Sequence, residues 1–173
     1  IEGLDDKAVI DRIVDENLFQ YPTEKSVRQM VLTCMKRLRA MEDESLIHQI
    51  GTQPVDVAKQ ICLYAMMKQY RLIWDFMITI IGEKYRMQDF SFGKKDVNVF
   101  FMQLREQDAY VEGWSESTCN KIRQVIIRIM VENEYLDNNK SEQLNPVWLN
   151  PMLENAIRNN NDDRALIAFN CFS

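Results

Sequence analysis

The chain has few residues that make turns, with five glycines and four prolines among 173 residues. This scarcity disfavours a turn-rich β-sandwich and favours long helices. Histidine is scarcer still, because His48 is the only one. A single imidazole excludes most acid–base schemes that use two histidines, and its place between apolar residues favours a structural or surface role.

The four cysteines lie far apart in the sequence, at positions Cys34, Cys62, Cys119 and Cys171. No pair has CxxC spacing, and with a single histidine in the chain this pattern argues against a zinc site built from histidine and cysteine. Three of them fall within apolar helical patterns, which favours buried side chains over reactive thiols. Reduced thiols are typical of a cytosolic protein.

Catalytic motifs are also absent: the sequence contains no GxxxxGK[ST], GxGxxG, GxSxG or HExxH. Its carboxylates are numerous but lack metal-site spacing, and pairs such as Asp5–Asp6 are typical of helix N-termini. The chain is therefore predicted to have no enzymatic activity, cofactor or small-molecule substrate.

No hydrophobic run is long enough to cross a membrane. The most apolar stretch, residues 62–82, is interrupted by Lys68, Arg71 and Asp75. Its longest uncharged piece, residues 76–82, falls short of the roughly 20 residues that a span requires. The sequence shows no signal peptide, although it begins with Ile1. We expect a cytoplasmic protein with a buried central helix.

The net charge of −5 opposes nucleic-acid binding when taken as a whole, but the charges are segregated. Residues 1–16 carry six acids and two bases, a net of −4. Residues 22–41 carry five bases and one acid, a net of +4. A basic helix therefore follows an acidic one.

Apolar residues recur at steps of three and four along most of the chain, which predicts a mainly α, multi-helix bundle. Whether residues 54–85 form one helix or two broken near Tyr70 stays open. We expect an N-terminal lobe, residues 1–88, and a C-terminal lobe, residues 89–173, sharing one core. Helices are expected over residues 5–18, 24–41, 43–50, 54–85, 94–107, 116–133 and 151–169, the last broken at 159–161.

The C-terminal lobe has the sequence pattern of a winged helix: a helix, a turn, a helix opened by Ser-x-x-Thr, and a β-hairpin expected within residues 135–149. Lys140 falls in the turn of that wing. Opposite an apolar stripe, the second helix carries side chains of the types that reach phosphates and base edges. These are Ser117, Asn120, Lys121, Gln124 and Arg128. The alternative interpretation is an ordinary solvated helix face.

The stripe expected to be buried consists of Cys119, Ile122, Val125, Ile126, Ile129 and Met130. The three tryptophans, Trp74, Trp114 and Trp148, also lie in apolar contexts and are expected in the core.

The N-terminal lobe is also expected to contain a helix-turn-helix-like element. Thr23 can cap a helix whose first turns present polar and basic side chains. Those side chains are Lys25, Ser26, Arg28 and Gln29. The alternative is that the basic helix only pairs with the acidic one, for example Arg28 with Asp11.

Three segments resemble the BrxA family, small helical proteins encoded in bacteriophage-exclusion (BREX) operons. They are Tyr70-Arg71-Leu72-Ile73-Trp74-Asp75-Phe76, Trp114-Ser115-Glu116-Ser117-Thr118-Cys119-Asn120-Lys121-Ile122 and Glu132-Asn133-Glu134-Tyr135-Leu136. The similarity extends from about Leu4 to the C-terminus and includes Glu16-Asn17-Leu18. Members have been described as inner-membrane proteins, which this sequence does not support.

The resemblance implies a non-catalytic BREX component with helix-turn-helix-like elements, affinity for double-stranded DNA and other BREX proteins as partners. The matching positions point to Ser117, Thr118, Asn120, Lys121 and the helix carrying Lys25 and Arg28 as the nucleic-acid-facing parts. A second hypothesis is a protein-interaction adaptor that assembles BREX enzymes. A third, RNA binding, is less favoured because no aromatic stacking platform is evident.

Overall fold

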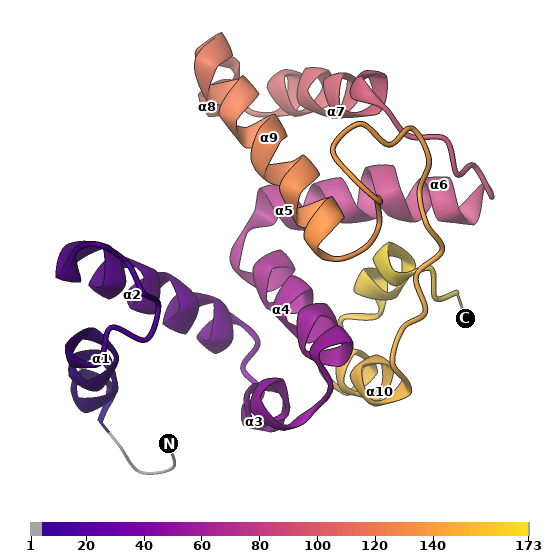
Figure 1. The fold of residues 1–173 in the computed structure, drawn as a ribbon. Helices are drawn as coiled ribbons and strands as arrows, with labels where there is room; N and C mark the ends of the chain where they lie inside the picture. Colours follow the sequence, from indigo (N-terminus) through magenta and orange to yellow (C-terminus); the bar gives the residue numbers. More distant parts are fainter. Residues whose placement is uncertain (1–4, 173) are drawn as a thin grey trace.

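A computed structural model describes residues 5–172 and shows a mainly helical protein (Figure 1), as the sequence predicts. In chain order the elements are α1 (Asp6–Asp15), α2 (Glu24–Ala40), α3 (Glu44–Thr52), α4 (Val55–Gln69), α5 (Arg71–Phe76), the π-helical segment η1 (Met77–Gly82), α6 (Glu83–Arg86), α7 (Lys94–Gln107), α8 (Ala109–Glu112), α9 (Glu116–Glu132), α10 (Pro151–Asn159) and the 3₁₀ segment η2 (Asp163–Phe169).

The central segment is two helices, which resolves the question that the sequence left open. α4 ends at Gln69 because Tyr70 adopts an extended conformation, with φ −121° and ψ 102°. From Arg71 the chain continues through α5, η1 and α6 in a new direction. Buried side chains from both helices, including Ile61, Tyr64 and Ile81, form the centre of the main hydrophobic core. That core includes residues from Met41 to Phe169.

The N-terminal helices α1 and α2 have a small core of their own. Val14 of α1 packs against Val27 and Val31 of α2, with Ile10, Ile13 and Met35 partly buried around them. Thr23 caps α2 as expected, its hydroxyl accepting a hydrogen bond from Ser26 N at 3.2 Å. α2 also packs against α4, which attaches the pair to the rest of the molecule.

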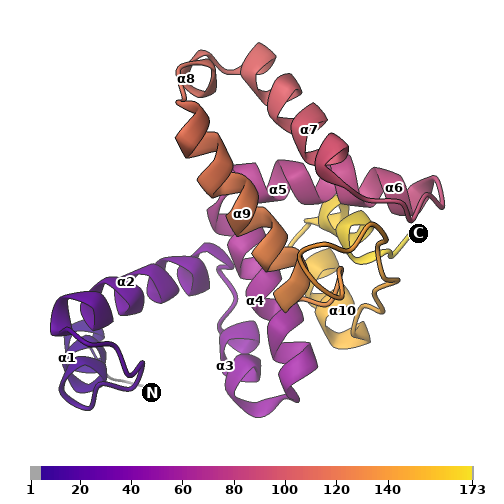
Figure 2. The same cartoon turned by 45° about the horizontal axis from the view of Figure 1, so that its top comes forward.

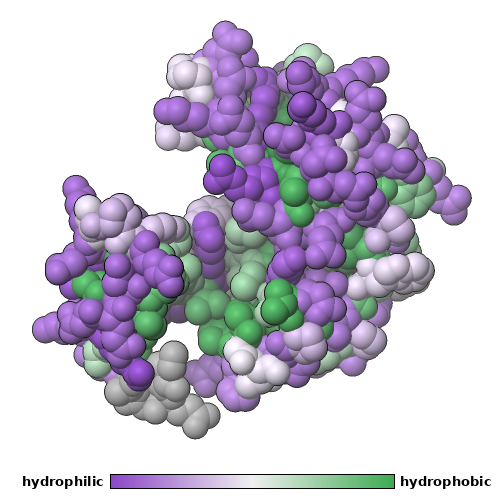
Figure 3. Space-filling view, in the orientation of Figure 1, coloured by the Kyte–Doolittle hydropathy of each residue, from purple (hydrophilic) through white to green (hydrophobic). Residues whose placement is uncertain are grey.

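The surface differs between the parts of the molecule (Figure 3). Apolar side chains are visible over α3 and α4, in a hollow beside the N-terminal helices. The part formed by α7, α8 and α9 is mostly polar on the same view. Within residues 5–172, none of the helices combines the length and the apolar character that a membrane crossing needs.

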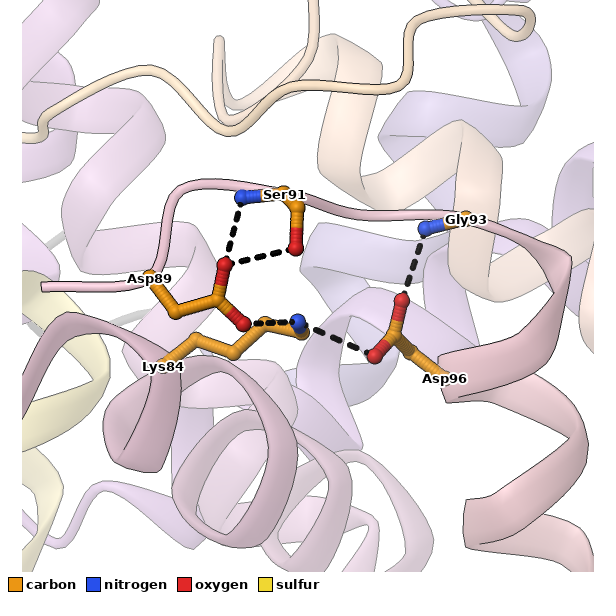
Figure 4. Close-up of polar contacts among 5 residues, drawn as sticks. All are labelled: Lys84, Asp89, Ser91, Gly93 and Asp96. Carbon is orange, nitrogen blue, oxygen red and sulfur yellow. Dashed lines mark hydrogen bonds and ion pairs between the residues drawn. The ribbon is translucent and has the colours of Figure 1, made fainter. Parts of the chain in front are cut away.

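A polar cluster joins α6 to α7 (Figure 4). Lys84 Nζ lies 2.8 Å from Asp89 Oδ2 and 3.0 Å from Asp96 Oδ1. Asp96 Oδ2 also accepts a hydrogen bond from Gly93 N at 2.8 Å, and Asp89 accepts two from Ser91. Because Lys84 is held by a carboxylate on each side, the loop between the helices is fixed and α7 starts in a defined direction.

The β-hairpin expected after α9 is not confirmed: residues 133–150 contain no two-stranded pair in the described structure. The only bridge there joins Gln143 to Ser91, far away in sequence. Leu144 is buried and its N–H donates to Phe90 O at 2.7 Å, while Phe92 N–H donates to Glu142 O at 2.9 Å. The segment therefore pairs with residues 90–92, because burial of its leucine favours that contact over local pairing.

Candidate nucleic-acid interface

The local sequence fixes where α9 begins and which side it buries. Ser115 caps the helix, with its hydroxyl accepting a hydrogen bond from Thr118 N at 3.2 Å. On the inner side Cys119, Ile126 and Met130 are each about 1% exposed. Together with α7 and the short α8, α9 forms a V whose apex is α8 (Figure 2). One face of α9 is therefore held against the core and the other is open.

The open face carries the side chains that the sequence singled out. Ser117, Asn120, Lys121, Gln124 and Arg128 are all exposed. Val125 is also on this side: the sequence placed it in the buried stripe, but its side chain is 51% exposed. The stripe at steps of three and four is wider than the strip of helix that the core covers, and Val125 lies at its outer edge.

The charges on this face are free of intramolecular ion pairs in the described part of the chain, since neither Lys121 nor Arg128 lies within 4.0 Å of a carboxylate. The two acids of the helix, Glu116 and Glu132, lie at its two ends and are exposed. The middle of α9 therefore presents two cations without a neutralising carboxylate, beside the exposed amides of Asn120 and Gln124.

Two arginines that the sequence pattern did not single out brace α9 against α7. Arg123 Nη1 donates to Asn120 Oδ1 at 2.7 Å, and its guanidinium lies 5.1 Å from the centre of the Phe101 ring. Arg105 of α7 contacts Trp114 O at 3.4 Å and Cys119 Sγ at 3.2 Å. Both line an open cleft of about 520 Å³ in the V. Arg123 borders the apolar stripe, so periodicity alone could not separate a bracing residue from an exposed one.

Lys140 is exposed as expected, in the turn of the irregular segment that follows α9. The turn is closed by its own side chains: Asn138 Oδ1 accepts from Lys140 N at 2.9 Å, and Ser141 Oγ accepts from Asn138 N at 3.1 Å. The lysine is thus presented on an ordered turn, although the strands of a wing do not form.

The second predicted set, on α2, is exposed but partly neutralised. Lys25, Ser26, Arg28 and Gln29 all face solvent. Arg28 lies 3.4 Å from Asp11 of α1, which is the ion pair that the alternative interpretation named. Arg39 pairs with Asp6, and Arg37 lies over the ring of Tyr70. Figures 1 and 2 show α2 and α9 on different parts of the molecule, so the two sets do not form one surface.

The expected core positions of cysteine and tryptophan are confirmed only in part. Cys119 is buried, whereas Cys62 is exposed. Trp74 and Trp114 are partly buried against the main core, whereas Trp148 is 83% exposed. Within residues 5–172, no group of three or more histidine, cysteine or carboxylate side chains is arranged to hold a metal ion.

These features define a helical protein whose candidate site is an exposed helix face. Comparison with known proteins identifies its family: the model of the BrxA family matches residues 1–161, and the chain belongs to that family. The resemblance noted from the sequence is therefore confirmed.

The relatives cover most of the chain. It is 32% identical over 142 residues to the BREX protein BrxA of Bacillus cereus (strain H3081.97), which covers 82% of this chain and 70% of that protein. It is 25% identical over 162 residues to the BREX protein BrxA of Paramagnetospirillum magneticum (strain ATCC 700264 / AMB-1), covering 94% and 81%. The crystal structure of an uncharacterized protein from Magnetospirillum magneticum has the same fold, with a TM-score of 0.76 and 24% identity over 97% of this chain and 85% of that one.

Proposed function

We propose that this protein is a non-catalytic, double-stranded DNA-binding component of a BREX phage-defence system, acting in the cytoplasm. The observation that carries the proposal is the outward face of α9, where Lys121 and Arg128 have no ion-pair partner in the described structure and alternate with exposed amides. The relatives named BREX protein BrxA support the assignment to that system.

The size of α9 suits a major groove. At about 1.5 Å per residue, the face from Ser117 to Arg128 is roughly 17 Å long, and a major groove about 12 Å wide admits one helix. In a helix-turn-helix-like arrangement, α8 and the following turn would rest near the backbone while α9 enters the groove. Asn120 and Gln124 would pair with adenine edges, and Val125 would contact a thymine methyl group.

Phosphate contacts would come from the flanks of this face. Lys121, Arg128 and Lys140 are exposed cations, and the free amides at the start of α9, beside Ser117, favour a phosphate. The set on α2 would make a secondary contact, because Arg28 must first leave Asp11. Because these contacts are electrostatic and the protein as a whole is acidic, its affinity for DNA should fall steeply as the salt concentration rises.

The test is a pair of matched double variants of the full chain. Lys121→Ala with Gln124→Ala removes one cation and one amide from α9, and Lys7→Ala with Gln107→Ala removes the same groups elsewhere. Fluorescence anisotropy with a 30-base-pair duplex measures the affinity over a salt series. We expect the α9 variant to bind about tenfold more weakly, with a salt slope smaller by about one, and the control to bind as the parent does.

Equal affinity of both variants and the parent, with intact folding by circular dichroism, would overturn the proposal. In that case the adaptor hypothesis gains support if the α9 variant keeps other BREX proteins in a pull-down and keeps phage resistance in cells. Competition with double-stranded RNA of the same sequence tests the RNA alternative: a stronger competitor than the DNA duplex would also contradict the proposal.

A further inference from the structure

Trp148 is the most exposed large apolar side chain of the described structure, at 83%. It lies in the irregular segment between α9 and α10, where its two neighbours, Val147 and Leu149, are partly buried against the main core. The segment therefore alternates inward and outward side chains, and its largest residue points outward. Isolated exposed apolar residues are common on protein surfaces, but a tryptophan side chain with most of its surface in water is uncommon.

The backbone that carries this tryptophan is held in place. Gln60 of α4 donates from Nε2 to Trp148 O at 2.9 Å and accepts at Oε1 from Asn150 N at 3.0 Å. Further back, Tyr85 Oη donates to Asn145 O at 2.6 Å. A ring presented on fixed backbone loses little conformational freedom when it meets a partner, which favours a binding role.

A cleft of about 340 Å³ lies beside the ring, between α4 and the segment. Its charged lining residues are Asp56, Lys59 and Glu134. Lys59 Nζ is already bound to Glu134 Oε1 at 2.8 Å, whereas Asp56 is exposed and makes no ion pair within the described part of the chain. The cleft therefore combines an open aromatic face with a free carboxylate and a net charge of −1.

We propose that Trp148 and Asp56 form a docking point for an arginine or lysine side chain on a basic segment of a partner protein. Tryptophan is the best aromatic face for a cation, and the carboxylate would bind the same charged group. Aromatic anchors of this kind dominate protein interfaces. Nucleic acid fits less well, because its phosphates would approach Asp56 and Glu134. This docking point is separate from the α9 face.

The test uses the ¹⁵N-labelled full chain and two short probes, a tetra-arginine peptide and a tetra-glutamate peptide, both blocked at their ends. The indole N–H signal of Trp148, assigned by its loss in Trp148→Ala, should shift with the arginine peptide and stay in place with the glutamate peptide. Asp56→Asn should weaken the arginine titration several-fold. Trp148→Phe, followed through the backbone amide signal of residue 148 because its indole is gone, should retain part of the response, since an aromatic face remains.

Tyr110→Ala is the matched control, because Tyr110 is 78% exposed on α8. It should leave the arginine titration unchanged. An unmoved indole signal, an equal response to both peptides, or a larger shift with single-stranded oligothymidine would each overturn the proposal. Duplex binding by Trp148→Ala should equal that of the parent, so loss of the peptide response and loss of DNA binding are separate outcomes.

Discussion

Tyr64 of α4 donates a hydrogen bond from its hydroxyl to Asp162 Oδ2 at 2.5 Å, across 98 positions of sequence. Lys68 Nζ lies 2.5 Å from the same oxygen, and the side chains of Lys68 and Asp162 are 25% and 18% exposed. The carboxylate thus fastens the loop between α10 and η2 to the central helix. The Tyr64 hydroxyl and the Lys68 ammonium group therefore share one acceptor, Asp162 Oδ2, at a site with little access to water.

Replacing Asp162 with alanine should therefore destabilise the fold. Tyr64 would stay buried and Lys68 partly buried without their acceptor, at a cost of about 2 kcal/mol in the free energy of unfolding. Urea denaturation followed by circular dichroism measures it. Glu16→Ala, which breaks an exposed i,i+4 pair with Arg12, is the control and should cost less than about 0.5 kcal/mol. A cost as small as that of the control would contradict the structural role.

Stability should fall in alkali. Burial, with the hydrogen bond to Asp162, raises the pKa of Tyr64 above the ordinary value of 10.0, and burial raises the pKa of Tyr85 in the same direction. The folded state therefore holds these protons more tightly than the unfolded state does. Their contribution is complete below pH 10 and is lost as the pH rises above it. Melting temperatures between pH 8 and 12 should decline, and less steeply in Tyr64→Phe.

In acid, Asp89 should control part of the pH dependence. Its hydrogen bonds from Lys84 and Ser91 hold the pKa of this carboxyl well below the ordinary value of 3.8. The stabilisation is present above that ordinary value and is lost as the pH falls through the lower folded pKa. Between pH 4 and pH 2 the parent should lose stability more steeply than Asp89→Asn, as thermal melts will show. If stability falls equally steeply with pH in the parent and in Asp89→Asn, protonation of Asp89 in the cluster of Figure 4 does not contribute to the acid sensitivity of the fold.

A side chain at Gly82 should destabilise the fold. A β-carbon there would lie 2.7 Å from Ile167 Cγ1 and 2.9 Å from Cδ1, where η1 packs on η2. Gly82→Ala should destabilise the protein by about 1–3 kcal/mol through overpacking. Adding Ile167→Ala to Gly82→Ala should cost less than the two single changes summed, because the double variant removes the clash. If the losses in the free energy of unfolding, measured by urea denaturation, are strictly additive, then the added β-carbon does not clash with Ile167.

The two basic helices should contribute unequally to DNA binding. Arg28→Ala removes a cation that already pairs with Asp11, whereas Lys121→Ala removes one with no ion pair in the described residues. The smaller loss of duplex affinity is therefore expected for Arg28→Ala, and Asp11→Asn should tighten binding if α2 contacts DNA. Anisotropy titrations at one salt concentration compare the three. A larger loss for Arg28→Ala would make α2 the main contact.

The sequence predicts helices well because their signals are local. The expected helix over residues 24–41 is Glu24–Ala40 in the structure, and that over 116–133 is Glu116–Glu132. Both begin at a capping hydroxyl and follow a 3.6-residue stripe. The open side of α9 follows from the same periodicity, which is why all of its predicted polar residues are exposed.

The predictions that the structure does not confirm concern features that depend on contacts between distant parts of the chain. The hairpin after α9 is absent from the described structure because Leu144 and Gln143 pair with residues 90–92. Trp148 is exposed because Val147 and Leu149 take the inward positions of an extended segment, which no helical pattern could indicate. The division of the chain near residue 88, and the contact of the polar faces with DNA, stay predictions.

The small valine core between α1 and α2 has a wider consequence. The buried residues of this cluster are Val14, Val27 and Val31, far fewer than in the main core, so local opening of α1 should cost less free energy than opening of the main core. Such an opening would separate Asp6 from Arg39 and Asp11 from Arg28, and both arginines would lose their counter-ions. The positive charge that α2 presents to solvent therefore depends on how firmly α1 packs against it.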